Sequence, residues 1–227
     1  MGRRLTIDGS ETPLERWLRT TFPRATWEAP GDALGVLTHH VRLPGSGRGL
    51  PPDHLFLDLE TLGFVGRPLF LIGLFVPLSG REGKIVQIIA RDYSEEEDVL
   101  RYFADRYAPT PVWVTFNGKS FDVPCLNLRC AYHLLSRHEP REHLDLLHWA
   151  RRHFRDVFPD CRLKTLEWRV CGRVRNDDLD GSRVPDAYHR YIRDSDPTYL
   201  EPILRHNRDD LLTLAELFLN LADMEES

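Results

Sequence analysis

Residues 54–60 read HLFLDLE, and this stretch decides the fold. An apolar run ends there in two carboxylates, Asp58 and Glu60, which are separated by one residue. Because side chains alternate between the two faces of a β-strand, a strand over residues 54–60 carries both carboxylates on one face. Two neighbouring buried acids repel each other, and a divalent cation between them would remove that cost. The alternative is a strand whose polar end runs out into solvent.

Apolar runs on either side of short turns predict a sheet around this strand. Residues 68–76 (PLFLIGLFV) and 85–90 (IVQIIA) are typical of central strands, and short connections make these runs an antiparallel meander with the first strand. A helix beginning near Ser94 carries acids at its positive end and leads to a fourth strand at 111–116 (PVWVTF). Because a helix separates the two, we expect the fourth strand to be parallel to the first.

The fourth strand runs directly into the turn 117–122, which reads NGKSFD. In sheets with helical crossovers, ligands gather at the carboxyl ends of the strands, so Asp122 is expected close to Asp58 and Glu60. The alternative is that Asp122 only caps a helix over 123–135. Residues 143–147 are predicted to form a short fifth strand, with Asp145 as a helix cap or a carboxylate behind the site.

Residues 202–221 form a strongly amphipathic helix pattern near the end of the chain. His206 and Asp210 stand one turn apart within its apolar stripe, whereas Asp209 is turned by about 100° away from them. Polar groups on an inward face need partners. The pair either satisfies itself as an ion pair or supplies a fourth metal carboxylate with a general base one turn before it.

Composition bounds the class of protein. A chain of 227 residues suits one domain with an N-terminal extension, and we divide it into an extension at 1–50 and a main domain at 51–227. Residues 12–15 (TPLE) predict the start of a helix in the extension. No secretory signal or membrane span is evident, and the four cysteines show no zinc spacing, so we expect a cytoplasmic protein with reduced thiols.

Charge is unevenly distributed along the chain. The net charge is −5, which excludes a protein held on nucleic acid by bulk positive charge. Residues 129–175 nevertheless hold eleven Lys and Arg against six Asp and Glu. Nearly all basic residues are Arg, which suits bidentate phosphate contacts, although genome composition would produce the same bias.

The ordered acids resemble a known family. Asp58 and Glu60 on the first strand, Asp122 after the fourth strand and a His-Asn-x-x-Asp motif on the last helix resemble the DEDD superfamily of 3′–5′ exonucleases, and most closely the YprB-type ribonuclease H-like domains of bacteria. Segments 116–122 (FNGKSFD), 145–148 (DLLH) and 180–182 (DGS) followed by a proline also match. The resemblance covers 54–221 and implies an α/β, ribonuclease H-like fold with a mixed five-stranded sheet, order 3-2-1-4-5, flanked by helices.

The resemblance also implies a site. Asp58, Glu60, Asp122 and Asp210 are expected to hold two Mg²⁺ or Mn²⁺ ions, because hard cations match carboxylate oxygens. The superfamily's tyrosine branch spaces its Tyr four residues before the last Asp, and its histidine branch uses five. His206 stands at the tyrosine spacing, so it either accepts the proton of the attacking water or only orients that water.

The expected function is a two-metal-dependent nuclease, acting as a 3′–5′ exonuclease on single strands or 3′ ends of nucleic acid. Substrate contacts are expected from Asn117, from Lys119 to a phosphate and from Phe64 by stacking on the terminal base. Lys119 as an ordinary loop residue and Phe64 as a core residue are the alternatives. Rival functions are a structure-selective endonuclease on the same fold, and a non-catalytic nucleic-acid-binding or adaptor module.

Overall fold

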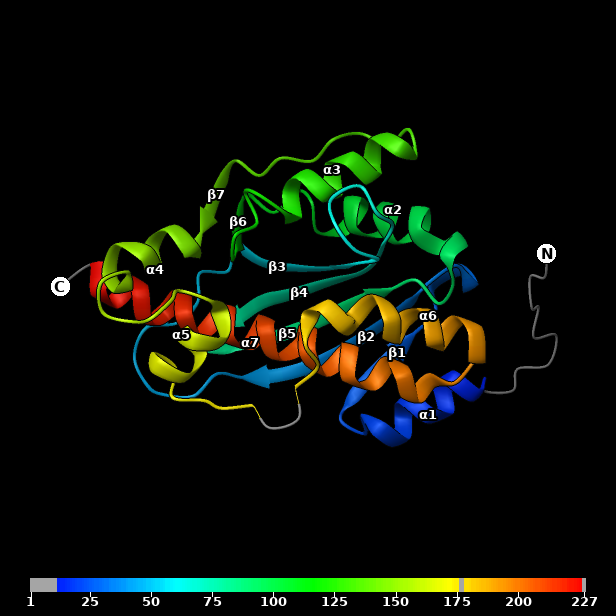
Figure 1. The fold of residues 1–227 in the computed structure, drawn as a ribbon, viewed down its shortest axis with the longest axis horizontal. Coiled ribbons are helices and arrows are strands. Elements are labelled where there is room, and N and C mark those ends of the chain that lie inside the picture. The colour runs from blue at the N-terminus through cyan, green and yellow to red at the C-terminus, as the bar shows by residue number, and fades with distance from the viewer. Residues whose placement is uncertain (1–11, 176–177, 226–227) are drawn as a thin grey trace.

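Seven strands form one mixed sheet in a computed structural model that describes residues 12–175 and 178–225 (Figure 1). The order across the sheet is β1-β2-β5-β4-β3-β6-β7. β3 is antiparallel to β4 and parallel to β6, and β6 is parallel to β7. The strands are β1 Ala25–Glu28, β2 Gly35–Arg42, β3 His54–Thr61, β4 Leu69–Ser79, β5 Glu82–Ile89, β6 Val112–Thr115 and β7 Glu142–Asp145.

The five strands predicted from the sequence are β3 to β7, and their order 5-4-3-6-7 matches the predicted 3-2-1-4-5. The number was wrong, because β1 and β2 add two strands beyond β5. β2 pairs with β5 from Gly35 opposite Ile89 to Arg42 opposite Glu82. An unpaired β5 edge would leave a row of backbone groups open, and β2 fills that edge. The division of the chain at residue 50 stays a prediction.

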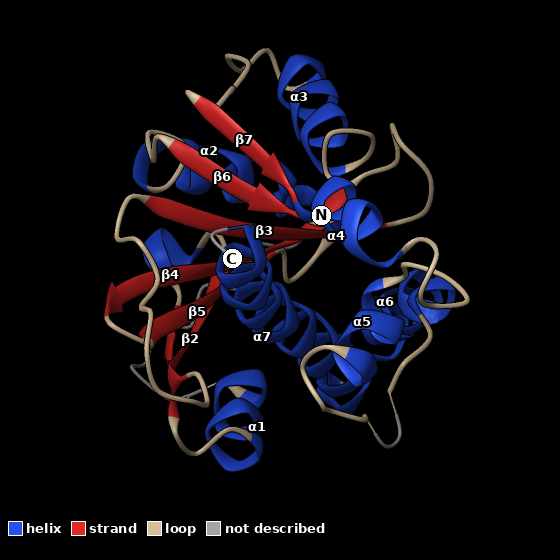
Figure 2. Cartoon of the chain, turned by 90° about the vertical axis from the view of Figure 1, so that its left-hand side faces the viewer, coloured by secondary structure: helices blue, strands red, loops and turns tan. Residues whose placement is uncertain are grey.

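Helices lie on both sides of β3. In Figure 2, α2 and α3 lie above β3 and α7 lies below it, crossing towards β5. α1 begins with the predicted capping box, in which Thr12 and Glu15 each accept a hydrogen bond from the other's backbone N–H. The helices are α1 Pro13–Thr21, α2 Glu96–Arg106, α3 Asp122–Tyr132, α4 Leu146–Phe154, α5 Leu163–Arg169, α6 Val184–Asp194 and α7 Leu200–Glu225.

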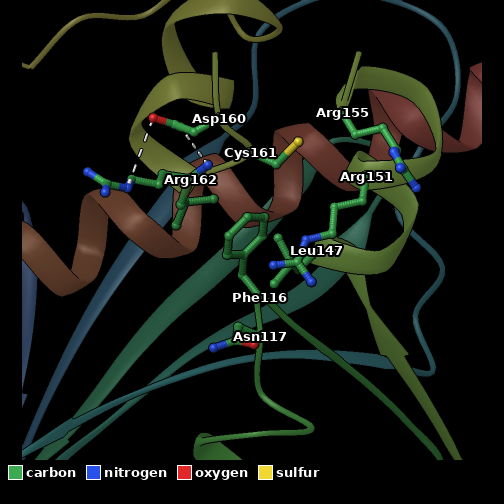
Figure 3. Close-up of a pocket in the computed structure, with 9 residues that line it drawn as sticks. Phe116, Asn117, Leu147, Arg151, Arg155, Asp160, Cys161 and Arg162 are labelled. Atoms are coloured by element: carbon green, nitrogen blue, oxygen red, sulfur yellow. Dashed lines mark hydrogen bonds and ion pairs between the residues drawn. The ribbon is translucent and has the colours of Figure 1, made fainter. Parts of the chain in front are cut away.

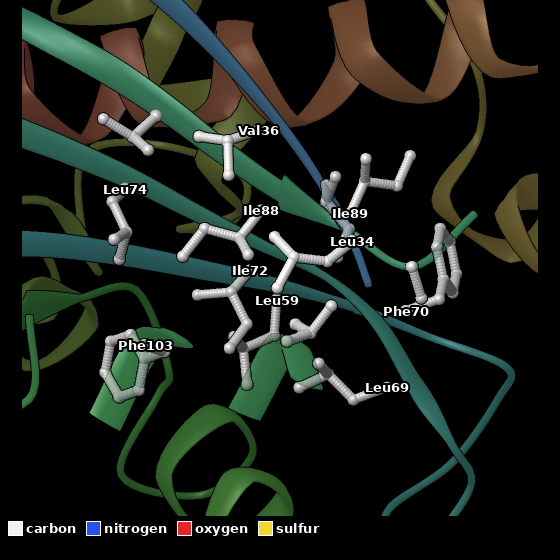
Figure 4. Packing of buried hydrophobic residues seen from close by; sticks show 14 of the residues in the cluster. Leu34, Val36, Leu59, Leu69, Phe70, Ile72, Leu74, Ile88, Ile89 and Phe103 are labelled. Carbon is white, nitrogen blue, oxygen red and sulfur yellow. The ribbon is translucent and has the colours of Figure 1, made fainter. Parts of the chain in front are cut away.

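The core follows from the alternation of β3. Leu57 and Leu59 belong to a buried cluster with Phe103 of α2 (Figure 4). On the opposite face, Phe56 packs edge-to-face on Phe218 of α7, with ring centroids 5.5 Å apart. Both faces are apolar up to residue 57, so the carboxylates of Asp58 and Glu60 emerge on the face that α7 covers.

No helix in the described ranges is long and apolar enough to cross a membrane. The expectation about a secretory signal concerns residues that lie outside the described part of the chain, as do positions 176 and 177 of the loop before α6.

Candidate active site

The two acids of β3 lie beyond the point at which the pairing of β3 with its parallel neighbour β6 ends. β6 pairs with β3 only as far as Phe56 opposite Val114, while β3 continues to Thr61. Asp58 is half-buried and Glu60 is buried. The strand therefore carries its carboxylates at the carboxyl end, beside a gap in the sheet that side chains must fill.

Asp122 fills part of that gap. Its Oδ1 accepts a hydrogen bond from the backbone N–H of Leu59 at 3.1 Å, between the two acids of β3. Asp122 is the first helical residue of α3, where Phe121 takes the N-cap position without a side-chain hydrogen bond. The capping alternative for Asp122 is therefore wrong, and its carboxylate lies beside Asp58 and Glu60 as the strand order predicts.

Asp145 holds the turn that leads to Asp122. Its carboxylate caps α4 by accepting from Leu147 N–H, at 3.1 Å, and it also accepts from Asn117 N–H at 2.8 Å and Lys119 N–H at 3.1 Å. Asn117 has a left-handed φ of 63°, which this turn requires. With the backbone tied to Asp145, the side chains of Asn117 and Lys119 are exposed beside the carboxyl end of β6.

α7 brings the remaining predicted residues to the same place. His206 Nε2 lies 3.5 Å from Asp210 Oδ2, and its Nδ1 lies 2.9 Å from Oδ1 of Asp178 in the loop before α6. Asp178 was not predicted, since its loop showed only an acidic composition. A carboxylate on Nδ1 favours the tautomer that carries its proton there and leaves Nε2 facing Asp210.

Arg175 is the second unpredicted neighbour. Its Nη2 lies 2.6 Å from Asp210 Oδ1, and its Nε lies 2.8 Å from Oε2 of Glu167, which is buried in α5. The guanidinium therefore compensates part of the charge at Asp210. Its place in the sequence, eight residues after Glu167 and far from α7, offered no signal of this contact.

Asn207 connects the site to the sheet. Its Nδ2 donates to Asp58 Oδ2 at 2.8 Å, and its Oδ1 accepts from Gln87 of β5 at 3.0 Å. Asn207 and Gln87 are both fully buried. A Cβ on Gly73 would overlap the Asn207 amide, so glycine in β4 makes room for it. The sequence did contain a signal, because Asn207 lies four residues from Ile203 and from Leu211 on the buried face of α7.

Burial raises the pKa values of all four predicted acids, and compensation by His206 and Arg175 is only partial. Burial and the charges of Asp210, Glu60 and Asp122 raise the pKa of Asp58 well above its usual range. Burial raises the pKa of Glu60 to about 8, against the opposing charge of His206. Burial raises the pKa of Asp122 to about 7. Burial also raises the pKa of Asp210, although His206 and Arg175 oppose it.

The same charges act on the histidine. Burial lowers the pKa of His206, but the neighbouring charges of Asp210, Glu60 and Asp178 outweigh that effect, so its pKa is raised. The imidazole is therefore more basic than usual as long as these carboxylates stay ionised.

The donor set fits a hard divalent cation. All four predicted ligands offer carboxylate oxygens, which hard cations prefer, and burial raises the pKa of each of them. Over the described ranges, however, no three His, Cys, Asp or Glu side chains already stand at metal-binding spacing. Asp58 is turned to Asn207 and Asp210 to Arg175. The ligand set stays a prediction.

Phe64 is not a core residue. It lies in the turn after β3 and 89% of its surface is exposed, which removes the alternative of a packed core phenylalanine. A large exposed ring next to a strand that ends in two acids is available for contact with another molecule.

Comparison with known proteins identifies the family. A model described as the RNase_H superfamily matches residues 55–222. The chain belongs to the ribonuclease H superfamily. The matched range begins in β3 and ends in α7, so this superfamily domain contains every predicted ligand. The two N-terminal strands precede it.

A curated relative and two solved structures are similar to this superfamily member. The Bacillus subtilis (strain 168) protein YprB, described as uncharacterized, is 30% identical over 186 residues, which are 78% of this chain and 44% of YprB. The family B DNA polymerase of the archaeon Pyrobaculum calidifontis aligns with a TM-score of 0.59 and 15% identity, over 94% of this chain and 31% of the polymerase. Brucella melitensis NrnC with bound Mg²⁺ aligns at a TM-score of only 0.34, with 14% identity over 79% of this chain and 94% of NrnC.

These likenesses differ in what they show. YprB supports the family, and this chain spans less than half of its length. The polymerase likeness shows the fold alone, because 15% identity is low.

Proposed function

We propose that this ribonuclease H superfamily member is a metal-dependent nuclease that hydrolyses phosphodiester bonds of nucleic acid, as a 3′–5′ exonuclease on single strands or 3′ ends. The observation that carries the proposal is the gathering of Asp58, Glu60, Asp122 and Asp210 in one negative field. In a module that only binds nucleic acid, four such acids would be unfavourable, because they repel each other and also repel the phosphate backbone. A nuclease uses such a set to hold cations.

In this proposal the four carboxylates hold two Mg²⁺ or Mn²⁺ ions. When bound, the ions supply positive charge for the attacking and leaving oxygens of a phosphodiester. Asp122 stays attached to Leu59 N–H through one oxygen, and Asp58 to Asn207 through one oxygen, so each keeps its other oxygen for a cation. These contacts fix the orientation of the carboxylates in advance.

His206 is proposed as the proton acceptor. Asp178 orients the ring through Nδ1, which leaves Nε2 on the side of Asp210 and Glu60. A base in this position accepts the proton of the attacking water, and Asp178 stabilises the imidazolium that forms. The four-residue spacing to Asp210 puts Nε2 only 3.5 Å from that carboxylate, so the ring acts next to the predicted ligands.

The exposed residues around the site are proposed to contact substrate. Phe64 offers a ring for stacking on the terminal base, and such contacts contribute about 1–3 kcal/mol per base. Lys119 and Asn117 lie in the turn that Asp145 holds, close enough to the acids for Asp145 itself to raise the pKa of Asp122. Lys119 is proposed to bind a phosphate.

The test is cleavage of 5′-labelled single-stranded DNA and RNA with Mn²⁺, comparing wild type with Asp58→Ala and Asp210→Ala. Each variant is expected to lose roughly 10³-fold or more in rate, because removing a ligand forfeits several kcal/mol of charge stabilisation. Asp209→Ala is the matched control, since Asp209 is the next residue and pairs with Arg208 instead. Its rate is expected to stay near wild type.

Two outcomes would contradict the proposal. If the wild type cleaves neither polymer in the presence of metal, the proposal of a nuclease is contradicted. Equal losses in Asp209→Ala and Asp210→Ala would remove the site assignment. A substrate with a blocked 3′ end separates the two modes of cleavage, since an exonuclease stops on it and an endonuclease does not.

A further inference from the structure

A cleft of about 780 Å³ opens at the carboxyl end of β6 (Figure 3). Phe116 and Asn117, which follow β6, form one side, and α4 and the segment leading into α5 form the others. The cleft adjoins the candidate active site, because Asn117 lines it and begins the turn that leads to Asp122, in which Asn117 O accepts a hydrogen bond from Phe121 N–H at 3.2 Å. The volume is in the range of about 300–1,000 Å³ that is usual for ligand sites.

The cleft is positively charged in a protein of net charge −5. Arg151, Arg155 and Arg162 line it, together with a single acid, Asp160. The carboxylate of Asp160 makes local hydrogen bonds: its Oδ1 accepts from Arg162 N–H at 3.0 Å and from Thr165 Oγ1 at 2.6 Å. The cleft therefore holds more positive than negative charge.

The three guanidinium groups are free to bind an anion. Arg155 Nε lies 3.7 Å from Asp156, and Arg162 Nε lies 4.0 Å from Asp160, both on strongly exposed side chains. Such pairs contribute little, typically under about 1 kcal/mol. Arg151 makes no ion pair with any residue in the described ranges. Arginine binds phosphate through two parallel N–H donors, so the cleft offers up to three such contacts.

Apart from Asn117, the remaining residues that line the cleft are apolar. Phe116 is half-buried, and Figure 3 shows its ring between Arg162 and Leu147, with Cys161 above it. An aromatic side chain contributes nothing to the binding of free inorganic phosphate. A nucleic-acid strand presents phosphates and flat bases together, which matches arginines around a ring.

We propose that this cleft binds a single nucleic-acid strand next to the candidate active site, with Arg151, Arg155 and Arg162 on its phosphates and Phe116 against a base. The inference rests on the proposed function and adds the path of the strand to it. It also resolves an electrostatic difficulty, because four acids by themselves repel the substrate and the arginines supply attraction beside them.

The test measures binding of a fluorescein-labelled single-stranded oligonucleotide, as DNA and as RNA, to the full chain in EDTA, where cleavage is absent. The triple variant Arg151→Ala/Arg155→Ala/Arg162→Ala is expected to bind at least 10-fold more weakly. Its slope of log affinity against log salt is expected to fall by roughly 2, at about 0.7 for each lost single-strand phosphate contact. Phe116→Ala is expected to weaken binding without changing the slope.

The matched control removes the same charge elsewhere. Arg101→Ala/Arg137→Ala/Arg190→Ala changes three exposed arginines outside the cleft. If this control loses as much affinity and slope as the cleft variant, only overall charge matters and the proposal is overturned. Unchanged binding by the cleft variant overturns it as well. So does displacement of the oligonucleotide by a mononucleotide at equal phosphate concentration, which would show an anion site and no strand path.

The binding and cleavage measurements distinguish failure of the strand path from failure of the proposed nuclease activity. If the cleft variant loses binding while wild type shows no cleavage with Mn²⁺, the strand path stands and the nuclease falls. If wild type cleaves and the cleft variant binds and cleaves like wild type, the nuclease stands and the strand path falls.

Discussion

Two clusters of buried charged groups in this molecule behave in opposite ways. Glu96 of α2 is 4% exposed and accepts from Arg129 through both carboxylate oxygens, at 2.6 and 2.7 Å, and from Leu69 N–H at 2.7 Å. Burial acts to raise the pKa of Glu96, but Arg129 and His133 outweigh it and the pKa is lowered. Glu60 is also buried, with 9% of its surface exposed, and burial raises its pKa to about 8.

The difference is one of compensation. At Glu96 every charge has its counter-charge within the protein, so the cluster is complete and fastens α2 to α3 and to β4. Asp58, Glu60 and Asp122 act on each other as like charges. Among the four predicted ligands, the described part of the chain provides a guanidinium, that of Arg175, to Asp210 alone. A fold keeps uncompensated charge in its interior at a cost to stability, which is expected where an external cation completes the site. On this argument Glu96 belongs to a structural cluster, whereas the acids at Asp58 form the site that we propose to be functional.

The two clusters are expected to differ most in how the free energy of unfolding responds when one charged group is removed from each. Arg129→Met leaves Glu96 buried without its main counter-charge, so we expect a loss of about 3–5 kcal/mol in the free energy of unfolding, measured by urea denaturation. Asp58→Asn relieves repulsion, so in EDTA we expect unchanged or increased stability. The double variant Glu96→Gln/Arg129→Met is the control, and it should recover part of the loss. Similar destabilisation by Arg129→Met and Asp58→Asn would show that the clusters do not differ.

A smaller effect is expected at Asn207, which orients Asp58. Asn207→Ala removes the amide that holds Oδ2, so we expect a loss of about 10–100-fold in cleavage rate or metal affinity, as for other residues that orient metal ligands. Gly73→Ala should act in the same direction, because its methyl group displaces the Asn207 amide. Asn220→Ala on the same helix is the control, since that amide bonds only to Glu216 O and Cys171. Equal rates for wild type and Asn207→Ala would show that Asp58 needs no orientation.

A further expected effect is the pH dependence of stability without metal. The folded pKa values of Glu60 and Asp122, about 8 and about 7, lie above the ordinary 4.5 and 3.8. Between the ordinary and the raised values the folded state holds protons that the unfolded chain has lost, so the free energy of unfolding falls as pH rises. Urea midpoints in EDTA should therefore decrease from about pH 5 to about pH 8.5, and Mn²⁺ should restore them at the upper end.

The control for this dependence is Glu60→Gln, whose midpoints should vary less with pH than those of wild type. Rising stability over the same pH range would show that the carboxylates are compensated in solution, and the distinction from Glu96 would be lost.

Local pattern was enough for the strands and for the last helix. The alternation of residues 54–60 and the apolar runs after it predicted the strands from β3 to β7, because period and connection length follow from backbone geometry, and the resemblance to the family implied their full order. β1 and β2 joined the sheet for a reason that lies outside their own sequence, namely the open edge of β5.

The sequence predicts Asp58 and Glu60 as site residues because two acids end an apolar strand, and Asp122 because the strand order places it at the same edge. That placement is physical: parallel strands end together, whatever their distance along the chain. The contacts that distinguish the site came only with the tertiary structure. Asp178 and Arg175 reach α7 through a loop without periodicity, and Asn207 meets Asp58 only because Gly73 leaves room. Sequence determined which acids share a strand end, and packing decided which of them are left without a counter-charge.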